Sequence, residues 1–273
     1  MYRLVNAFYF SPTGTTGKVA ARLAEELSRS MCIEKNVRII DFTLPDKREV
    51  QYDFADDDLV VVGVPVIAGR VPNVLLKFLN AVRGNNASAV ALVVYGNRNY
   101  DDALVELKDL LEKAGFIVKA GCAFIGEHSF SNVLAKGRPD GEDMSLAEEF
   151  AAKISEKIKS GTDSPVEVKG NKNYSSYYKP RDREGNPVDF RKIVPKTGPS
   201  CTGCNICIEV CPMGSIDSED PSRMSGICIK CCACVKNCPT QAKHFDDEHF
   251  VMHKRELEED CRERKEPELF LQH

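Results

Sequence analysis

The feature that most constrains this chain is a cysteine motif that occurs twice near its C-terminal end. Residues 201–212 read CTGCNICIEVCP and residues 228–239 read CIKCCACVKNCP, so both copies have the pattern C-x-x-C-x-x-C-x-x-x-C-P. Every cysteine of the pattern recurs 27 residues later, which indicates an internal duplication. Nine of the 12 cysteines lie between Cys201 and Cys238. Such clustering favours metal binding over a disulfide scaffold.

The cysteine spacing is typical of 4Fe-4S ligands. Three thiolates on a tight loop bind three irons of one cluster, and the fourth, released by the Cys-Pro turn, reaches the other cluster. The predicted ligand sets are Cys201, Cys204, Cys207 and Cys238 for one cluster, and Cys228, Cys231, Cys234 and Cys211 for the other. Structural zinc, the alternative, usually takes two separated C-x-x-C pairs and has no use for a third cysteine. Cys232 is left over, and we interpret it as a packing residue.

On these motifs, residues 200–245 resemble a two-cluster bacterial ferredoxin. The resemblance implies a small α+β domain that transfers single electrons. One departure is Lys243, because ferredoxins of this type commonly carry an aliphatic residue there. A positive charge beside a cluster is expected to raise its reduction potential.

The first part of the chain alternates short apolar segments with helical segments. Strands are expected at residues 3–10, 37–42, 59–65, 89–95 and 116–126, and helices at 16–30, 73–82, 100–114 and 145–159. Strands this rich in Val, Ile and Leu are typical of a parallel sheet that helices cover on both faces. We therefore predict an α/β domain with a five-stranded, doubly wound parallel sheet.

The stretch SPTGTT, Ser11 to Thr16, lies where the first strand gives way to the first helix. It is not a nucleoside-triphosphate loop, because Pro12 replaces the first glycine and Val19 follows Lys18 where a hydroxyl is needed. Free backbone N–H groups at a helix N-terminus, supplemented by hydroxyls, bind a phosphate monoester. The alternative is an ordinary capped helix.

This loop resembles the phosphate loop of flavodoxins, and the resemblance extends over most of residues 1–160. It implies that FMN is bound by three loops at the carboxyl edge of the sheet. The residues that it assigns to FMN are Ser11, Thr13, Gly14, Thr15 and Thr16 at the phosphate, Pro65, Val66, Ile67, Ala68 and Gly69 over one flavin face, and Tyr95, Gly96 and Asn97 at the pyrimidine edge, with Tyr100 stacked on the ring. Ile67 departs from the aromatic residue common in that loop. Two alternatives remain. Tyr100 could be an ordinary packing residue, and His128 could be a structural residue that contacts neither flavin nor substrate.

Charge is distributed unevenly along the chain. Residues 166–198 carry eight basic and four acidic side chains, whereas residues 246–273 carry five basic and ten acidic ones. We predict an FMN domain at residues 1–165, a basic linker at 166–198, a two-cluster domain at 199–245 and a charged helical tail at 246–273. A formal net charge of -4 argues against nucleic acid as a partner. No apolar run is long enough to span a membrane, and we expect a cytoplasmic protein.

Taken together, the chain resembles the flavodoxin-domain ferredoxin fusions of anaerobic bacteria and archaea. The resemblance implies an electron-transfer protein that passes electrons between two 4Fe-4S clusters, FMN and a soluble redox partner protein. The alternative is an FMN-dependent reductase of a small organic acceptor, with His128 or Arg98 positioning that acceptor near Ile67. A third possibility is a first domain that has lost flavin and only docks partners.

Overall fold

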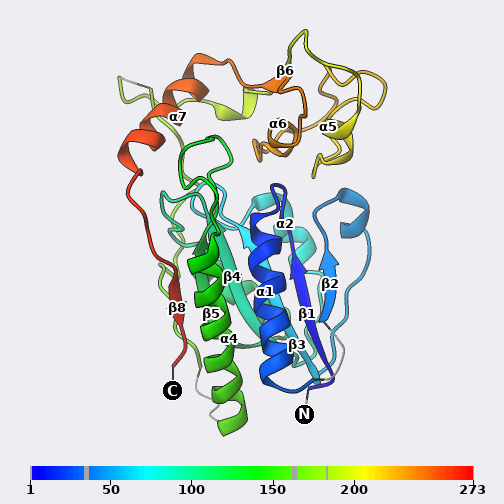
Figure 1. Cartoon of the computed structure of the whole chain (residues 1–273), viewed down its shortest axis with the longest axis vertical. Helices are drawn as coiled ribbons and strands as arrows, with labels where there is room; N and C mark the ends of the chain where they lie inside the picture. Colours follow the sequence, from blue (N-terminus) through cyan, green and yellow to red (C-terminus); the bar gives the residue numbers. More distant parts are fainter. Residues whose placement is uncertain (1, 34–36, 162–164, 183, 273) are drawn as a thin grey trace.

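A parallel sheet forms the centre of the N-terminal part of the chain (Figure 1). The structure is a computed structural model and describes residues 2–33, 37–161, 165–182 and 184–272. The parallel strands are β1 (Leu4–Tyr9), β2 (Val37–Asp41), β3 (Asp58–Pro65), β4 (Ser88–Tyr95) and β5 (Ile117–Ile125). Their order, β2-β1-β3-β4-β5, is doubly wound about β1 and β3. The predicted α/β fold with a mostly parallel sheet is therefore confirmed.

Helices cover both faces of this sheet. Helices α1 (Thr15–Ser30) and α4 (Gly141–Ser160) lie on one face, and α2 (Asn73–Leu79) and α3 (Ala103–Lys113) lie on the other. The two faces carry separate hydrophobic cores, one of which contains Phe8, Phe42 and Phe78. Strand β4 is buried along its whole length, because it has a helix layer on each side.

The sheet has a sixth strand that the sequence analysis does not predict. Strand β8 (Glu268–Phe270) pairs antiparallel with β5, so Cys122 lies opposite Leu269. Leu269 packs against one core and Phe270 against the other, and this burial holds the strand at the sheet edge. The expected five-stranded sheet and fully helical tail are corrected accordingly: the tail forms α7 (Glu248–Asp260) and then β8.

The linker between the two parts lies against the α/β domain. The Arg70 guanidinium stacks on the rings of Tyr174 and Tyr177, at 4.7 and 5.0 Å from their centroids. Arg70 also forms a bidentate ion pair with Glu106; the Arg70 side chain is only 11% exposed and that of Glu106 only 4%. Cation–π contacts and a buried ion pair thus fix a segment that its polar composition suggests would be loose.

Replacing Arg70 by Ala is expected to destabilise the fold and release the linker. The change leaves the buried Glu106 carboxylate with the Val71 N–H as its one remaining partner among the described residues, and breaking a buried ion pair from one side costs about 3 kcal/mol or more. Urea unfolding and limited proteolysis near Tyr174 measure the two effects. The control is Arg83→Ala, whose ion pair with Asp53 is exposed and should contribute under about 1 kcal/mol. Equal stability of the two variants would contradict this account.

The cysteine-rich module consists of short elements joined by loops. They are α5 (Ile206–Glu209), α6 (Ala233–Lys236) and β7 (Lys243–His244). The linker contributes η2 (Phe190–Lys192) and, near its end, β6 (Lys196–Thr197). A further short helix, η1 (Pro45–Arg48), lies in the α/β domain. Strands β6 and β7 form a two-stranded antiparallel sheet. The module lies above the carboxyl ends of the parallel strands, whereas both chain termini lie at the opposite end (Figure 1).

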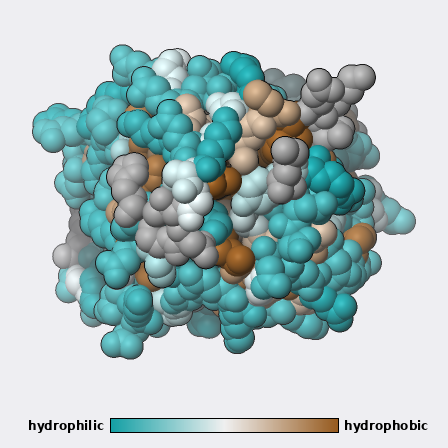
Figure 2. Space-filling view, turned by 90° about the horizontal axis from the view of Figure 1, so that it is seen from below, coloured by the Kyte–Doolittle hydropathy of each residue, from teal (hydrophilic) through white to brown (hydrophobic). Residues whose placement is uncertain are grey.

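The end of the molecule that carries the termini is mostly hydrophilic, and its hydrophobic residues form small separate groups (Figure 2). Among the described residues, no helix combines the length and the apolar character that crossing a bilayer requires.

Candidate functional site

The SPTGTT loop connects β1 to α1 and has a fixed shape. Gly14 adopts a left-handed conformation with φ 84° and, as the N-cap residue of the helix that follows, has no side chain to cap it. The Ser11 hydroxyl accepts a hydrogen bond from Gly17 N at 2.9 Å, and Ser11 N donates to Thr43 Oγ1 at 2.7 Å. Within the described part of the chain, the hydroxyls of Thr13, Thr15 and Thr16 have no hydrogen-bond partner. The loop therefore presents free donors at a helix N-terminus, as a phosphate requires.

Lys18 lies outside this group of donors. Its ammonium group donates to the carbonyl of Pro139 at 2.6 Å, in the loop before α4. A nucleoside-triphosphate loop needs its lysine at the phosphates. The engagement of Lys18 elsewhere agrees with the sequence argument against that class of site.

The second loop leaves the sheet at Pro65, the last residue of β3. Ile67 and Arg70 exchange two backbone hydrogen bonds, which closes a tight turn through Ala68 and Gly69. Gly69 has φ 78°, a left-handed conformation that favours glycine, and a Cβ at this position would lie 2.3 Å from Asp101 Oδ2, which would have to move. The carbonyl of Ala68 accepts from Tyr178 N at 2.9 Å, which places the linker on this loop.

The third loop follows β4 and lies beside the second. A Cβ on Gly96 would lie 2.4 Å from His128, so this loop packs tightly against the loop after β5. Asn97 is only 1% exposed, and its Nδ2 donates to the carbonyls of Cys261 and Glu263. Its Oδ1 is buried without a partner among the residues that the structure describes. The three loops that the sequence analysis assigned to FMN thus share one edge of the sheet.

Tyr100 is a correction to the sequence analysis. It is 1% exposed, its ring lies 5.5 Å from that of Tyr95, and its hydroxyl donates to Glu268 Oε2 at 2.7 Å. Burial and this carboxylate raise its pKa well above the ordinary value. Tyr100 is therefore a packing residue, the alternative left open above, and its ring is not available to stack on a flavin.

His128 lies behind the third loop in a neutral form. Its Nδ1 accepts from Phe130 N at 3.1 Å, and burial lowers its pKa to about 4. The nearby His253 and Lys236 lower the pKa further in the same direction. His128 is therefore a structural hydrogen-bond acceptor, which agrees with the interpretation of this histidine as a structural residue and not a ligand contact.

The buried His128 makes stability depend on pH. Its pKa is about 4 in the folded chain and near 6.5 when unfolded, so between these values the unfolded chain binds more protons. The free energy of unfolding is therefore highest above about pH 6.5 and decreases as the pH falls towards about 4. Between about pH 7.5 and 5.5, we expect the loss to be about 1 kcal/mol smaller in His128→Gln than in the unmodified chain. Urea unfolding measures this; the exposed His249→Gln is the control, and identical pH profiles for all three proteins would refute it.

The two predicted cysteine sets line two separate cavities. The first is lined by Cys201, Cys204, Cys207 and Cys238, together with Pro221, Thr240 and Lys243. The second is lined by Cys211, Cys228, Cys231 and Cys234, together with Cys232. Each cavity thus combines three cysteines of one copy with the last cysteine of the other copy.

The duplication is also visible in the backbone. Left-handed residues occur at Gly203 and Lys230, at Asn205 and Cys232, and at Gly214 and Gln241, always 27 positions apart. Helices α5 and α6 have the same offset. Cys211 Sγ accepts from Ser215 N at 3.4 Å, and Cys238 Sγ accepts from Ala242 N at 3.2 Å. Both loops therefore hold their cysteines by the same geometry.

The two sets differ in exposure and surroundings. Cys201 and Cys204 are exposed, whereas burial raises the pKa of both Cys231 and Cys234 to about 12. Cys232 is 3% exposed and belongs to a hydrophobic cluster with Ile193 and Phe250. Among the described residues, no three His, Cys, Asp or Glu side chains converge on a single metal-ion position. A four-iron cluster is bound by four thiolates, each on a different iron, and not by ligands that converge on one point; each cavity is lined by four such cysteines.

The cysteine module contacts the α/β domain through the side of the second cavity. Ile229 packs against the core of the α/β domain, and the Lys236 ammonium group bonds Glu127 at 2.6 Å. Arg48 stacks over Phe10 at 5.5 Å from its ring and donates to the carbonyl of Pro212. We therefore call the set around Cys231 the inner set, and the set around Cys204 the outer set.

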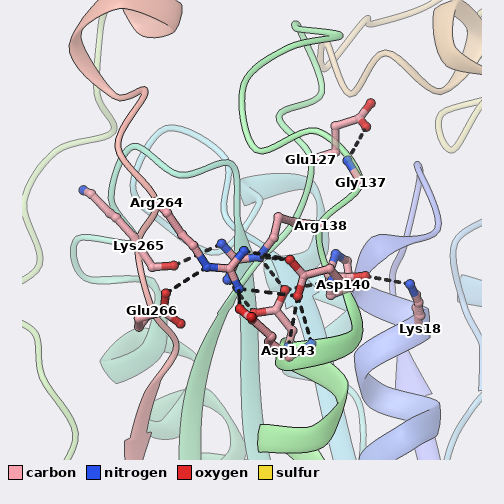
Figure 3. Close-up of polar contacts among 11 residues, drawn as sticks. Lys18, Glu127, Gly137, Arg138, Asp140, Asp143, Arg264, Lys265 and Glu266 are labelled. Atoms are coloured by element: carbon pink, nitrogen blue, oxygen red, sulfur yellow. Dashed lines mark hydrogen bonds and ion pairs between the residues drawn. The ribbon is translucent and has the colours of Figure 1, made fainter.

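A polar network that the sequence analysis missed holds the tail beside the third loop (Figure 3). Arg264 bonds Asp140 at 2.7 Å and Glu142 at 2.8 Å, at the N-terminus of α4. Arg138 pairs with the fully buried carboxylate of Asp143 and donates to the carbonyl of Lys265 at 3.1 Å. The only signal in the sequence is the alternation of charges in the tail, which does not indicate partners so distant in the chain.

Comparisons with known proteins identify the N-terminal part. Residues 7–120 match the family model described as "Flavodoxin domain", which defines a flavodoxin-like domain within the chain. Solved structures similar to this chain include a flavodoxin from the domain Archaea, with 17% identity over 58% of this chain and 99% of that chain and a TM-score of 0.40. A flavodoxin of Streptococcus pneumoniae TIGR4 has 16% identity over 56% and 99%, with a TM-score of 0.39. Rubredoxin oxygen:oxidoreductase of Desulfovibrio gigas has 19% identity over 58% and 36%, with a TM-score of 0.40. No curated protein matches the chain.

Proposed function

We propose that this chain is an electron-transfer protein that holds FMN and two 4Fe-4S clusters and exchanges electrons with a soluble redox partner protein. One observation carries the proposal: two cavities are each lined by one complete set of four cysteines, in the crossed arrangement that two-cluster ferredoxins require. When bound, the clusters supply one-electron transfer and FMN couples one-electron to two-electron transfer.

The residues of the α/β domain fit FMN. The hydroxyls of Thr13, Thr15 and Thr16 and the open N-terminus of α1 would hold its phosphate. The match of residues 7–120 to a flavodoxin domain supports the same assignment.

The residues of the cysteine module fit two iron–sulfur clusters. Burial raises the pKa of Cys231 and Cys234, so both thiols stay protonated without a neighbouring positive charge. Their thiolate forms therefore need such a charge nearby. Bound iron supplies that charge. Backbone N–H groups directed at Cys211 and Cys238 are of the kind that stabilise cluster sulfurs.

The surroundings of the second loop favour a carrier over the alternative, a reductase of a small organic acceptor. The linker lies on that loop, since Tyr178 N bonds the Ala68 carbonyl. Arg98 is paired with Asp101 and stacked on Tyr178, and His128 is buried and neutral. Both side chains that would position an acceptor beside Ile67 are therefore already engaged.

The test is anaerobic stopped-flow reduction of the bound flavin by a low-potential one-electron donor protein, in the full chain. Cys204→Ser should slow flavin reduction at least about tenfold without releasing FMN, because Cys204 belongs to the exposed outer set. The matched control is Cys32→Ser, an exposed cysteine in the loop after α1 that should leave the rate unchanged. Equal rates in all three proteins would leave the two modules as separate functions.

A further inference from the structure

The tail contacts the third loop at several points. After α7 ends at Asp260, residues 261–270, which we call the strap, run along the α/β domain and end as β8 (Figure 1). Two strap carbonyls, those of Cys261 and Glu263, accept from Asn97 Nδ2. Further along, Lys265 donates to the Arg98 carbonyl, and Glu268 accepts from Tyr100. The strap therefore supplies the polar partners of the loop from Asn97 to Tyr100.

The strap is anchored to the α/β domain on both sides of these contacts. Arg264 is its main polar anchor, since its guanidinium bonds Asp140 and Glu142 at the N-terminus of α4 (Figure 3). The hydrogen bond from Arg264 lowers the pKa of Asp140 well below its ordinary range. At the other end, Glu268 bonds Lys169 at 3.1 Å as well as Tyr100. The strap is thus held where it meets the loop.

The third loop needs external support to keep its conformation. Asn97 and Asp101 have φ angles of 66° and 42°, a left-handed region that non-glycine residues seldom occupy. Such conformations persist where surrounding contacts impose them. Because two carbonyls accept from Asn97 Nδ2, they also determine which end of the amide is which. Oδ1 is left as a buried acceptor that has no donor among the described residues.

We propose that the strap is part of the flavin site: through its hydrogen bonds to Asn97, Arg98 and Tyr100 it holds the third loop in the conformation that binds the flavin. This inference rests on the proposed binding of FMN. The strap residues are positioning residues, since they act on the ligand through the third loop. FMN affinity therefore depends on a segment more than 160 positions from the loop in the chain.

The experiment compares two charge-matched double variants of the full chain. Arg264→Ala with Glu268→Ala removes both polar anchors of the strap, whereas Glu259→Ala with Arg262→Ala removes one exposed Glu at the end of α7 and one exposed Arg of the strap. The dissociation constant of FMN is measured by flavin fluorescence, and hydrogen exchange of residues 95–102 is measured without FMN. The first variant should raise the dissociation constant about tenfold, while the control stays within about twofold. The rescue variant Arg264→Lys with native Glu268 should bind nearly as tightly as the unmodified chain.

The outcomes separate this inference from the proposed function. Faster exchange in residues 95–102 together with weaker FMN binding, only in the first variant, supports the positioning role. Unchanged FMN affinity in that variant overturns the inference, even if exchange becomes faster, because the loop would then be supported but not used for flavin. Absence of FMN binding by the unmodified chain would instead refute the proposed function and the inference with it. Circular dichroism confirms that the compared proteins are folded.

Discussion

Replacing Cys231 by Ala is expected to reduce the iron content of the anaerobically prepared protein from about eight to about four atoms per chain. Cys231 lines the inner cavity with three further cysteines, and a 4Fe-4S cluster needs all four thiolates. None of the residues that line the outer cavity lies between Cys228 and Cys234, so the outer cluster should persist in this variant. Iron and acid-labile sulfide analysis, with electron paramagnetic resonance of the reduced protein, measures both quantities.

The chain offers a matched control one residue away. Cys232→Ala should retain about eight irons, because Cys232 packs with Ile193 and Phe250 and completes neither set. Its effect should be a loss of stability of about 1 kcal/mol from the removed buried sulfur. Equal iron loss in the two variants would show that the assignment of the inner set is wrong, and stoichiometric zinc in the unmodified protein would refute the clusters altogether.

Replacing Thr13 and Thr16 together by Val is expected to weaken FMN binding at least about a hundredfold. Both hydroxyls are free of protein partners among the described residues, at the open N-terminus of α1. Valine keeps the shape of threonine but removes the donor, and each hydrogen bond to a charged group contributes about 1.5–3 kcal/mol. Flavin fluorescence titration of the full chain measures the change.

Lys18 provides the control for this second prediction. Because its ammonium group bonds the Pro139 carbonyl, Lys18→Ala should change FMN affinity less than about threefold. Addition of ATP to the unmodified chain should not displace FMN. Unchanged affinity in the threonine double variant would show that the phosphate binds elsewhere. A strong effect of Lys18→Ala would instead indicate that the loop binds a nucleoside triphosphate.

Local patterns in the sequence were enough to predict the parallel sheet. Each strand is an apolar run bounded by turn residues, and β3 and β4 were predicted to within one residue of their observed starts. The helices differ more at their ends: α3 begins at Ala103 and α2 ends at Leu79, because the flanking residues belong to the loops that close the edge of the sheet. The hydrophobic period is a property of consecutive residues and is therefore readable without a structure.

The role of Tyr100 could not be predicted from the sequence. Its neighbours resemble those of a flavin-stacking residue, but its hydroxyl bonds Glu268, which lies 168 positions away. The sixth strand could not be predicted from the sequence either, because the three residues Glu268 to Phe270 are too short a pattern to indicate a strand by themselves. Only the free edge of β5, available in three dimensions, makes that pairing favourable.

The sequence by itself determined the elements whose information is local: the strands, the helix after SPTGTT, and the two cysteine sets, whose spacing of 27 is an arithmetic property of the chain. The tertiary structure alone decided which side chains remain free to meet a ligand. The Tyr100 hydroxyl bonds Glu268, the Lys18 ammonium group bonds the Pro139 carbonyl and Asn97 Nδ2 bonds the strap, whereas the hydroxyls of Thr13 and Thr16 have no partner among the described residues. The physical reason is that a hydrogen bond or a buried contact depends on distance in space. A polar side chain bonds the partner that the fold places beside it and is then unavailable to a ligand.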